Sequence, residues 1–349
     1  MRLVPRIVLL LSIALGPAAY GAGLQQVNDW LYVIDLSDLS IEEIAASGYD
    51  LVVMDYSQYG DEESEFTPGQ IAQLHAAGMT AVAYFSIGEA ESYRFYWQSS
   101  WTDNPPSWMG PENPEWEGNY KVRYWDSGWK QILFGTQSGT GKSYLDRIID
   151  QGFDGVYLDI VDAFEYWSDE EPELTRFQAR QAMKTLVQEI RDYARSTRGV
   201  EQFLIFPQNA PSIIMDDDYE LDELGREYLN LCDGIGAEDT WFNETDPQPE
   251  EEASEVVDLL DLFRSTGRER LVLCVDYVLD PQDSSQDRYN TFHRLAHEHG
   301  FLPYAAISDR DLNEIVIQTA VNGFLYSQPV PGLSAVGDWV DRTVLLSDK

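Results

Sequence analysis

Basic residues are scarce in this sequence. Its 349 residues include 61 Asp and Glu but only 23 Lys and Arg, so the formal net charge at pH 7 is −38. Binding to nucleic acid depends on cationic side chains that replace the counterions around the phosphates, and anionic membrane surfaces attract basic segments. The shortage of cations therefore argues against a nucleic-acid partner and against a membrane surface.

Lysine is the scarcer of the two basic residues, with only five positions among the 23. An acidic surface with little lysine is typical of proteins adapted to high salt, where ionic strength screens the repulsion between carboxylates. We expect a salt-adapted (halophilic) protein, with an acidic secreted protein of ordinary habitat as the alternative. Apolar residues make up 44% and aromatic residues 13% of the chain, which excludes a disordered acidic tail.

The sequence has no apolar run of the length that crosses a membrane, about 20 residues. An early run at 7–15 follows the basic residues Arg2 and Arg6 and precedes small residues that end near Ala22. This is the pattern of a cleaved signal peptide. We therefore expect residues 1–22 to be a signal peptide, and the mature protein to be secreted or periplasmic without a membrane anchor.

Motifs of several other enzyme classes are missing. No Gly-x-Ser-x-Gly turn is present, so serine-hydrolase chemistry lacks its nucleophile. No glycine-rich nucleotide turn follows an early strand, which argues against an open dinucleotide-binding sheet. The segment 135–143 (GTQSGTGKS) ends like a phosphate-binding loop, but its first glycine is one position too early and a predicted helix precedes it.

Cysteine and histidine are also rare. Cys232 and Cys274 are the only cysteines, and both lie in apolar, strand-like runs. We expect two buried thiols, with a disulfide as the alternative in an oxidising compartment. His293 and His297 lie near the end of a predicted helix, where their charge complements the helix dipole, so we predict no metal site there.

Eight short apolar runs recur along the chain, each followed by a helical pattern. Runs of this kind are typical of strands that are buried on both faces. Eight strand–helix units in series predict an α/β fold, a single (β/α)8 TIM barrel over residues 23–320, with residues 321–349 as a C-terminal extension packed on it. The runs are 31–35, 51–56, 80–86, 155–159, 203–208, 234–238, 271–277 and 302–308.

A long, tryptophan-rich insert follows the third strand. Six of the ten tryptophans fall within residues 86–153, at positions 97, 101, 108, 116, 125 and 129. Because the insert follows the carboxyl end of a strand, it lies on the face where barrel active sites are built. Aromatic rings stack on sugar rings, so a carbohydrate cleft is one interpretation. The other is that the rings form the insert's own core.

Acidic residues gather at the predicted strand ends. Asp159 ends the fourth strand and Glu238 the sixth. Alternate strands contribute to one layer of a barrel, so these two side chains can face each other across its mouth. Two facing carboxylates are what cleavage of a glycosidic bond requires, since one donates a proton to the leaving oxygen and the other attacks or activates water. Other strand-end acids are Asp35, Asp55 and Asp276.

Several segments resemble glycoside hydrolase family 114, the endo-α-1,4-polygalactosaminidases. GFDGVYLDIVDAF (152–164) resembles the segment with the family's nucleophilic Asp, and DGIGAEDTWF (233–242) resembles the strand with its acid/base Glu. YFSIGEAESYRFYW (84–97), GNYKVRYWD (118–126) and FPQNAP (206–211) resemble its bacterial extracellular branch. The resemblance implies Asp159 as nucleophile and Glu238 as general acid/base. An exchange of roles between Glu238 and Asp239 stays open.

The resemblance also implies a retaining, endo-acting enzyme on an α-1,4-linked, galactosamine-containing polysaccharide, with no metal or organic cofactor. We expect a monomer whose partner is that polysaccharide. Gln208, Asn209 and Tyr277 have side chains that hydrogen-bond sugar hydroxyls. The full set of expected substrate-binding residues is Asp55, Tyr84, Glu89, Trp125, Asp162, Gln208, Asn209, Trp241, Asp276 and Tyr277.

Two other function classes fit the same residues. Asp159, Asp162 and Asp276 could hold a divalent cation in a metal-dependent TIM-barrel hydrolase, because hard cations prefer carboxylate oxygens. A non-catalytic carbohydrate-binding barrel would use the same cleft without turnover.

Overall fold

The computed structural model describes residues 24–135, 141–283, 286–321 and 324–328. In these ranges eight parallel strands alternate with helices, as the apolar runs predict. Their side chains are largely buried, which explains the near-continuous apolar runs. The strands are β1 (Trp30–Val33), β2 (Leu51–Met54), β3 (Thr80–Ser86), β7 (Gly155–Asp159), β8 (Leu204–Pro207), β9 (Gly234–Glu238), β12 (Leu271–Leu279) and β13 (Leu302–Ile307).

Hydrogen-bonded ladders order the strands in two parallel groups, β1-β2-β3-β7-β8 and β9-β12-β13. A parallel bridge between Gln208 and Gly236 joins the end of β8 to β9. On the other side, the indole N–H of Trp30 in β1 donates to the carbonyl of Leu302 in β13 at 2.9 Å. The fold is therefore α/β and TIM-barrel-like, with the strands arranged in chain order.

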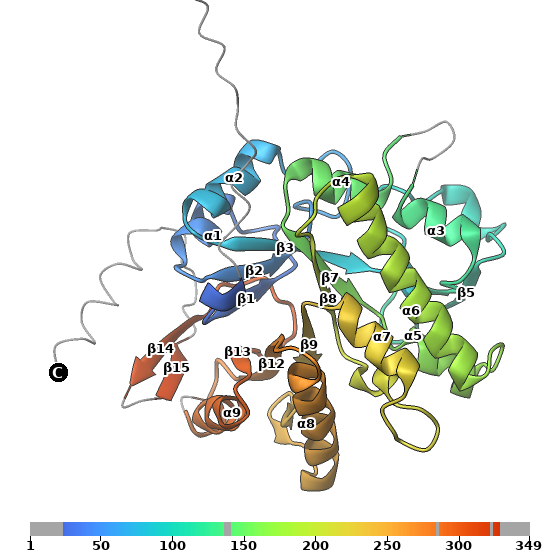
Figure 1. Cartoon of the computed structure of the whole chain (residues 1–349). Coiled ribbons are helices and arrows are strands. Elements are labelled where there is room, and N and C mark those ends of the chain that lie inside the picture. The colour runs from blue at the N-terminus through green and yellow to red at the C-terminus, as the bar shows by residue number, and fades with distance from the viewer. Residues whose placement is uncertain (1–23, 136–140, 284–285, 322–323, 329–349) are drawn as a thin grey trace, which may run out of the picture.

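Helices cover the outer side of the strands (Figure 1). They are α1 (Ile41–Ala46), α2 (Pro68–Ala76), α3 (Ser127–Leu133), α4 (Tyr144–Gln151), α5 (Ala163–Glu165), α6 (Arg176–Asp192), α7 (Glu223–Leu231), α8 (Glu250–Ser265) and α9 (Asp287–Glu298). Ser40 and Thr67 begin α1 and α2 with capping boxes, in which side chains satisfy amides that the first turn leaves unpaired. Among the helices of the described ranges, none has the length and apolar character needed to cross a membrane.

The chain segment between β3 and β7 contains a small antiparallel sheet. Its strands β4 (Glu89–Glu91), β5 (Met109–Glu112) and β6 (Asn119–Val122) are ordered β4-β6-β5. The indole N–H of Trp129 in α3 donates to the carbonyl of Ile87, directly after β3, at 2.9 Å. This contact fixes the segment at the carboxyl end of β3.

Most tryptophans of this segment pack against one another. Ring contacts run from Trp97 through Trp101 and Trp108 to Trp129, with centroid separations of 5.4, 5.1 and 5.0 Å. Trp116 is different, because 57% of its surface is exposed. The four packed rings form a core of the segment, whereas the exposed ring of Trp116 leaves the carbohydrate interpretation a prediction.

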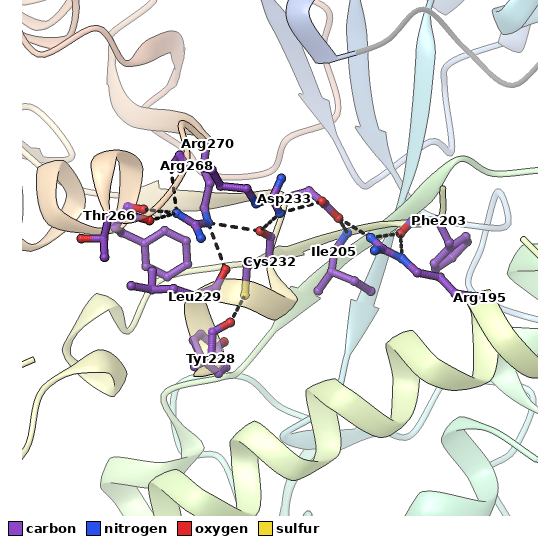
Figure 2. Close-up of polar contacts among 11 residues, drawn as sticks. Arg195, Phe203, Ile205, Tyr228, Leu229, Cys232, Asp233, Thr266, Arg268 and Arg270 are labelled. Atoms are coloured by element: carbon purple, nitrogen blue, oxygen red, sulfur yellow. Dashed lines mark hydrogen bonds and ion pairs between the residues drawn. The ribbon is translucent and has the colours of Figure 1, made fainter. Parts of the chain in front are cut away.

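An ionic network lies at the amino-terminal ends of β9 and β12 (Figure 2). The Asp233 carboxylate accepts hydrogen bonds from Arg195 at 2.7 Å and from Arg268 at 2.9 Å. The buried Arg270 guanidinium donates to backbone carbonyls at the ends of α7 and α8, including that of Thr266 at 2.7 Å. Arg270 thereby hydrogen-bonds carbonyls that the helix ends leave unpaired. The amino-terminal face of a barrel-like fold serves stability in this way, whereas active sites lie at the carboxyl ends of the strands.

The two cysteines are separate, buried thiols, as predicted. Near the C-terminus, β14 (Ile317–Val321) and β15 (Phe324–Gln328) form an antiparallel hairpin beside α9. The predicted signal peptide and most of the predicted C-terminal extension lie outside the described residues.

Candidate active site

A cavity of about 720 Å³ opens at the carboxyl ends of the parallel strands. Its volume is within the range of small-molecule sites, about 300–1,000 Å³. Nine of the twelve site residues expected from the sequence line it: Asp55, Tyr84, Glu89, Asp159, Asp162, Gln208, Asn209, Glu238 and Tyr277.

Asp159 is the last residue of β7, and its carboxylate accepts a hydrogen bond from the hydroxyl of Tyr84. Burial raises the pKa of Asp159 from 3.8 to about 8, and the charges of Glu238 and Asp162 add to this effect. The bond from Tyr84 acts in the opposite direction because it stabilises the charged form. The pKa of Asp159 therefore lies above neutral pH in the free protein.

Glu238 is the last residue of β9, and donors surround its carboxylate. The side-chain amides of Gln208 and Asn209, directly after β8, donate to Oε2, and the hydroxyl of Tyr277 in β12 donates to Oε1. Burial raises the pKa of Glu238, whereas the bonds from Tyr277 and Asn209 lower it. Three strands thus hold one carboxylate in place.

An aromatic floor, formed by Tyr32 and Tyr157, lies beneath the two carboxylates. Tyr157 is two residues before Asp159 in β7, so both side chains point to the same side of the strand. The rings of Tyr32 and Tyr157 are 5.4 Å apart and buried. Gly236, two residues before Glu238, leaves room for them, because a Cβ there would overlap the Tyr157 hydroxyl. The two rings contribute to the burial that raises the pKa values of both carboxylates.

The raised pKa of Asp159 predicts how stability depends on pH. The unfolded chain releases this proton near pH 3.8 and the folded chain near pH 8, so between these values the folded state binds one proton more. The free energy of unfolding contributed by Asp159 therefore falls as pH rises through this window. We expect the melting temperature of Asp159→Asn, relative to wild type, to increase between about pH 4.5 and about pH 8.5. A difference in melting temperature between Asp159→Asn and wild type that stays constant across this pH range would contradict the raised pKa of Asp159.

Strained backbone conformations occur where the strands of the site end. Ile160, Asn209 and Asp239 follow β7, β8 and β9 within two residues and have φ values of 58°, 57° and 52°. Positive φ is rare outside glycine, and rarest for a β-branched residue such as Ile160. Gly88 permits this turn, since a Cβ there would overlap the carbonyl of Ile160. Strained backbone conformations are common at functional sites, where contacts with the surrounding structure maintain them.

Asp239 is not among the residues that line the cavity. Its two carboxylate oxygens each accept a hydrogen bond from Nη2 of Arg310 at 2.6 Å. The Arg310 guanidinium also lies over the ring of Tyr277, 4.2 Å from its centre. Arg310 therefore supports the tyrosine that donates to Glu238. The charge of Arg310 lowers the pKa of Glu238, whereas the charge of Asp239 raises it.

We expect Arg310→Gln to raise the pKa of Glu238, because the charge of Asp239 is then unbalanced. The limb of the pH profile of kcat/KM that reports Glu238 should move to higher pH. Asp239→Asn is the matched variant and should move the same limb to lower pH. If both variants move it in one direction, the ion pair does not tune Glu238.

An ionic cluster in the cavity wall was not evident from the sequence. The buried Arg94 guanidinium donates to Asp55 at 2.6 Å and to Glu91 at 2.7 Å, and the hydroxyl of Tyr93 donates to Glu91 at 2.5 Å. All four residues line the cavity. Arg94 lies in the insert and Asp55 follows β2, so no local pattern connects them.

Three expected substrate-binding residues lie outside the cavity lining. The fully buried carboxylate of Asp276 accepts backbone amides from the loop after Glu238, including that of Trp241 at 2.9 Å. The Trp241 ring packs on Phe292 in α9 and on Phe301, directly before β13. Trp125 packs against Trp167, with ring centroids 5.5 Å apart. These contacts give the three side chains packing and hydrogen-bonding partners away from the cavity lining, and their predicted contact with substrate stays a prediction.

The structure does not bring together the three carboxylates that the metal-dependent alternative requires. Asp159 and Asp162 line the cavity, whereas the carboxylate of Asp276 accepts hydrogen bonds from backbone amides. Within the described ranges, no group of three or more His, Cys, Asp and Glu side chains is placed to hold a metal ion.

The fold and the site together define a class of protein. Two half-buried carboxylates end parallel strands of a TIM-barrel-like fold, in a cavity whose lining includes the exposed rings of Tyr59, Tyr93 and Trp116. Paired carboxylates at this face of the fold are the arrangement of glycoside hydrolases.

The chain belongs to glycoside-hydrolase family GH114, whose sequence profile matches residues 17–322. An uncharacterized protein of Methanocaldococcus jannaschii is 41% identical over 288 residues, which cover 82% of this chain and 78% of that protein. An uncharacterized protein of Thermotoga maritima is 39% identical over 290 residues, or 82% of this chain and 83% of that protein.

Two solved structures share the fold. The glycoside hydrolase domain of PelA from Pseudomonas aeruginosa superposes with a TM-score of 0.58 at 15% identity, covering 83% of this chain and 98% of that domain. Aspergillus fumigatus Ega3, solved in complex with galactosamine, superposes with a TM-score of 0.56 at 18% identity, covering 88% of this chain and 98% of Ega3. At these identities the likeness concerns the fold.

Proposed function

We propose that the protein is a retaining, endo-acting glycoside hydrolase that cuts an α-1,4-linked, galactosamine-containing polysaccharide. The observation that carries the proposal is the pair Asp159 and Glu238, which end two strands in one cavity and both have raised pKa values. Membership of family GH114 supports glycosidase activity. The complex of Ega3 with galactosamine supports the choice of sugar.

In the proposed reaction Glu238 donates its proton to the glycosidic oxygen while the Asp159 carboxylate attacks the anomeric carbon. The leaving chain departs with that proton, and a covalent glycosyl ester on Asp159 remains. The Glu238 carboxylate then takes a proton from a water molecule while the water oxygen attacks the anomeric carbon. The bond from that carbon to Asp159 breaks, and the Asp159 carboxylate is restored. The donors around each carboxylate hold both in position through these steps.

The charge of the cavity supports a cationic substrate. Its acidic lining residues outnumber Arg94 and Arg310; they are Asp35, Asp55, Glu89, Glu91, Asp159, Asp162, Glu238, Asp309 and Asp311. An acidic cleft attracts a polymer with protonated amines. A bound ammonium group also lowers the pKa of Asp159, which favours the ionised form that attacks.

The proposal extends to the whole protein. We infer that β13 and β1 close the strands into a (β/α)8 barrel, since Trp30 and Leu302 already bond across this junction. We further infer that residues 1–22 direct export to the periplasm or medium, that the mature chain is a monomer, and that the acidic surface is adapted to salt.

Product analysis on a panel of polysaccharides tests the function. We expect the wild-type protein to shorten an α-1,4-linked galactosamine polymer by internal cuts and to leave neutral glucans intact. Proton NMR of the first product should show a retained α configuration. Binding without cleavage would favour a carbohydrate-binding barrel, and activity lost with a chelator would favour a metal-dependent hydrolase.

A further inference from the structure

A second cavity of about 410 Å³ adjoins the first. The two share Glu89, Trp116, Ile160 and Asp162 as lining residues. Neither Asp159 nor Glu238 lines the second cavity, so the proposed reaction does not use it. Its volume is nevertheless that of a ligand site, about 300–1,000 Å³.

Trp116 stands where the two cavities meet. It is one of five large apolar side chains that are exposed among the residues the structure describes. Tyr59 and Tyr93 line only the first cavity, and Phe177 and Tyr219 line neither. An open indole ring at a cavity provides a flat apolar surface on which a ligand can stack.

The turn that carries Trp116 is braced. The amide of Asn113 donates to the carbonyl of Asn119 at 2.7 Å, and the side-chain amide of Asn113 donates to Glu89 at 2.9 Å. Gly118 has a φ of 89°, which favours glycine. The backbone that carries the ring is therefore held in position before a ligand arrives, which lowers the conformational entropy lost on binding.

The rest of the second cavity combines an aromatic ring with acidic groups. The Nζ atom of Lys121 lies 4.3 Å from the centre of the Tyr166 ring and 3.7 Å from Glu89. The acidic lining residues exceed this single cation, and they include Asp162 and Glu165. A flat apolar surface beside carboxylate acceptors matches a pyranose ring with hydroxyl and ammonium substituents.

We propose that Trp116 and the second cavity form a distal subsite for a further amino-sugar unit of the same polysaccharide chain, a unit that is held but not cleaved. This inference rests on the proposed function, because the chain in the second cavity is the one cut in the first. The shared lining residues provide the continuous path between the two cavities. The sugar ring stacks on Trp116, and its polar substituents face Glu89 and Asp162.

Kinetics with α-1,4-linked galactosamine oligomers of graded length tests the subsite. We expect Trp116→Ala to raise KM for long oligomers about tenfold at unchanged kcat, and to leave the shortest cleaved oligomers unaffected. Trp116→Phe should restore most of the loss. Phe177→Ala is the matched control, because Phe177 is equally exposed but lines neither cavity. A Trp116→Ala profile that is the same as wild type at every length overturns the subsite.

Calorimetry with the Asp159→Asn variant separates this inference from the proposed function. Affinity should increase with oligomer length in Asp159→Asn and lose that increase in Asp159→Asn/Trp116→Ala. Cleavage by the wild type together with affinity that does not depend on Trp116 overturns the subsite alone. No cleavage by the wild type overturns the proposed function, while affinity that depends on length and on Trp116 still supports the subsite.

Discussion

Asp159→Asn should lower turnover of the polymer by about 10³-fold or more, because an amide cannot supply the attacking carboxylate. The measurement is the release of reducing ends under conditions in which the wild-type protein shortens the polymer. Asp103→Asn is the control, since Asp103 is exposed in the insert and lines neither cavity. Turnover of Asp159→Asn within tenfold of wild type would remove Asp159 from the reaction.

A second variant assigns the roles within the pair. Glu238→Gln should also fail on the polymer, but it should still release an aryl leaving group that needs no proton. Asp159→Asn should fail on both substrates. The opposite pattern would show that the two carboxylates exchange roles.

Gly236→Ala should strongly destabilise the folded protein. Its Cβ would overlap the hydroxyl and ring of Tyr157, which is buried against Tyr32 and has no space to move into. Overpacking of this kind costs about 1–3 kcal/mol, and the surrounding rings place this site at the upper end. Urea unfolding should therefore show a lower free energy of unfolding at an unchanged m-value.

Gly69→Ala is the matched control for this substitution. Gly69 lies in the first turn of α2, and a Cβ there would meet only the Thr67 hydroxyl, at 3.9 Å. Alanine is the better helix former, so this variant should be as stable as wild type or more stable. Equal unfolding curves for Gly236→Ala and Gly69→Ala would contradict the tight fit beneath the carboxylates.

The parallel strands could be predicted from the sequence because burial on both faces leaves an unbroken apolar run. The runs 80–86, 155–159 and 234–238 coincide with β3, β7 and β9. The other runs differ from their strands by a few residues, since β8 leaves out the first and last residues of the run 203–208 and β12 continues two residues beyond the run 271–277. Asp159 and Glu238 could be predicted for the same reason, since each is the last residue of such a run.

The insert could not be predicted in the same way. Rings that form a core and rings that bind sugar have the same composition, and only packing separates Trp108 from Trp116. The pairing of Arg94 with Asp55 spans 39 residues and depends on how the insert folds back onto the strands. The sequence predicts Asp276 at a strand end like Asp159, but β12 continues to Leu279, and backbone amides that no sequence pattern indicates donate to the Asp276 oxygens.

The cavity residues come from two different parts of the chain, the strands and the insert, and this division has an evolutionary consequence. The two carboxylates proposed to react belong to β7 and β9, whereas Arg94, Glu89 and Trp116 belong to the segment between β3 and β7. On the proposed function, mutation, duplication or replacement of that segment can alter which polymer is bound while the proposed catalytic pair stays intact. Related enzymes can therefore change their substrate range without a change in reaction mechanism.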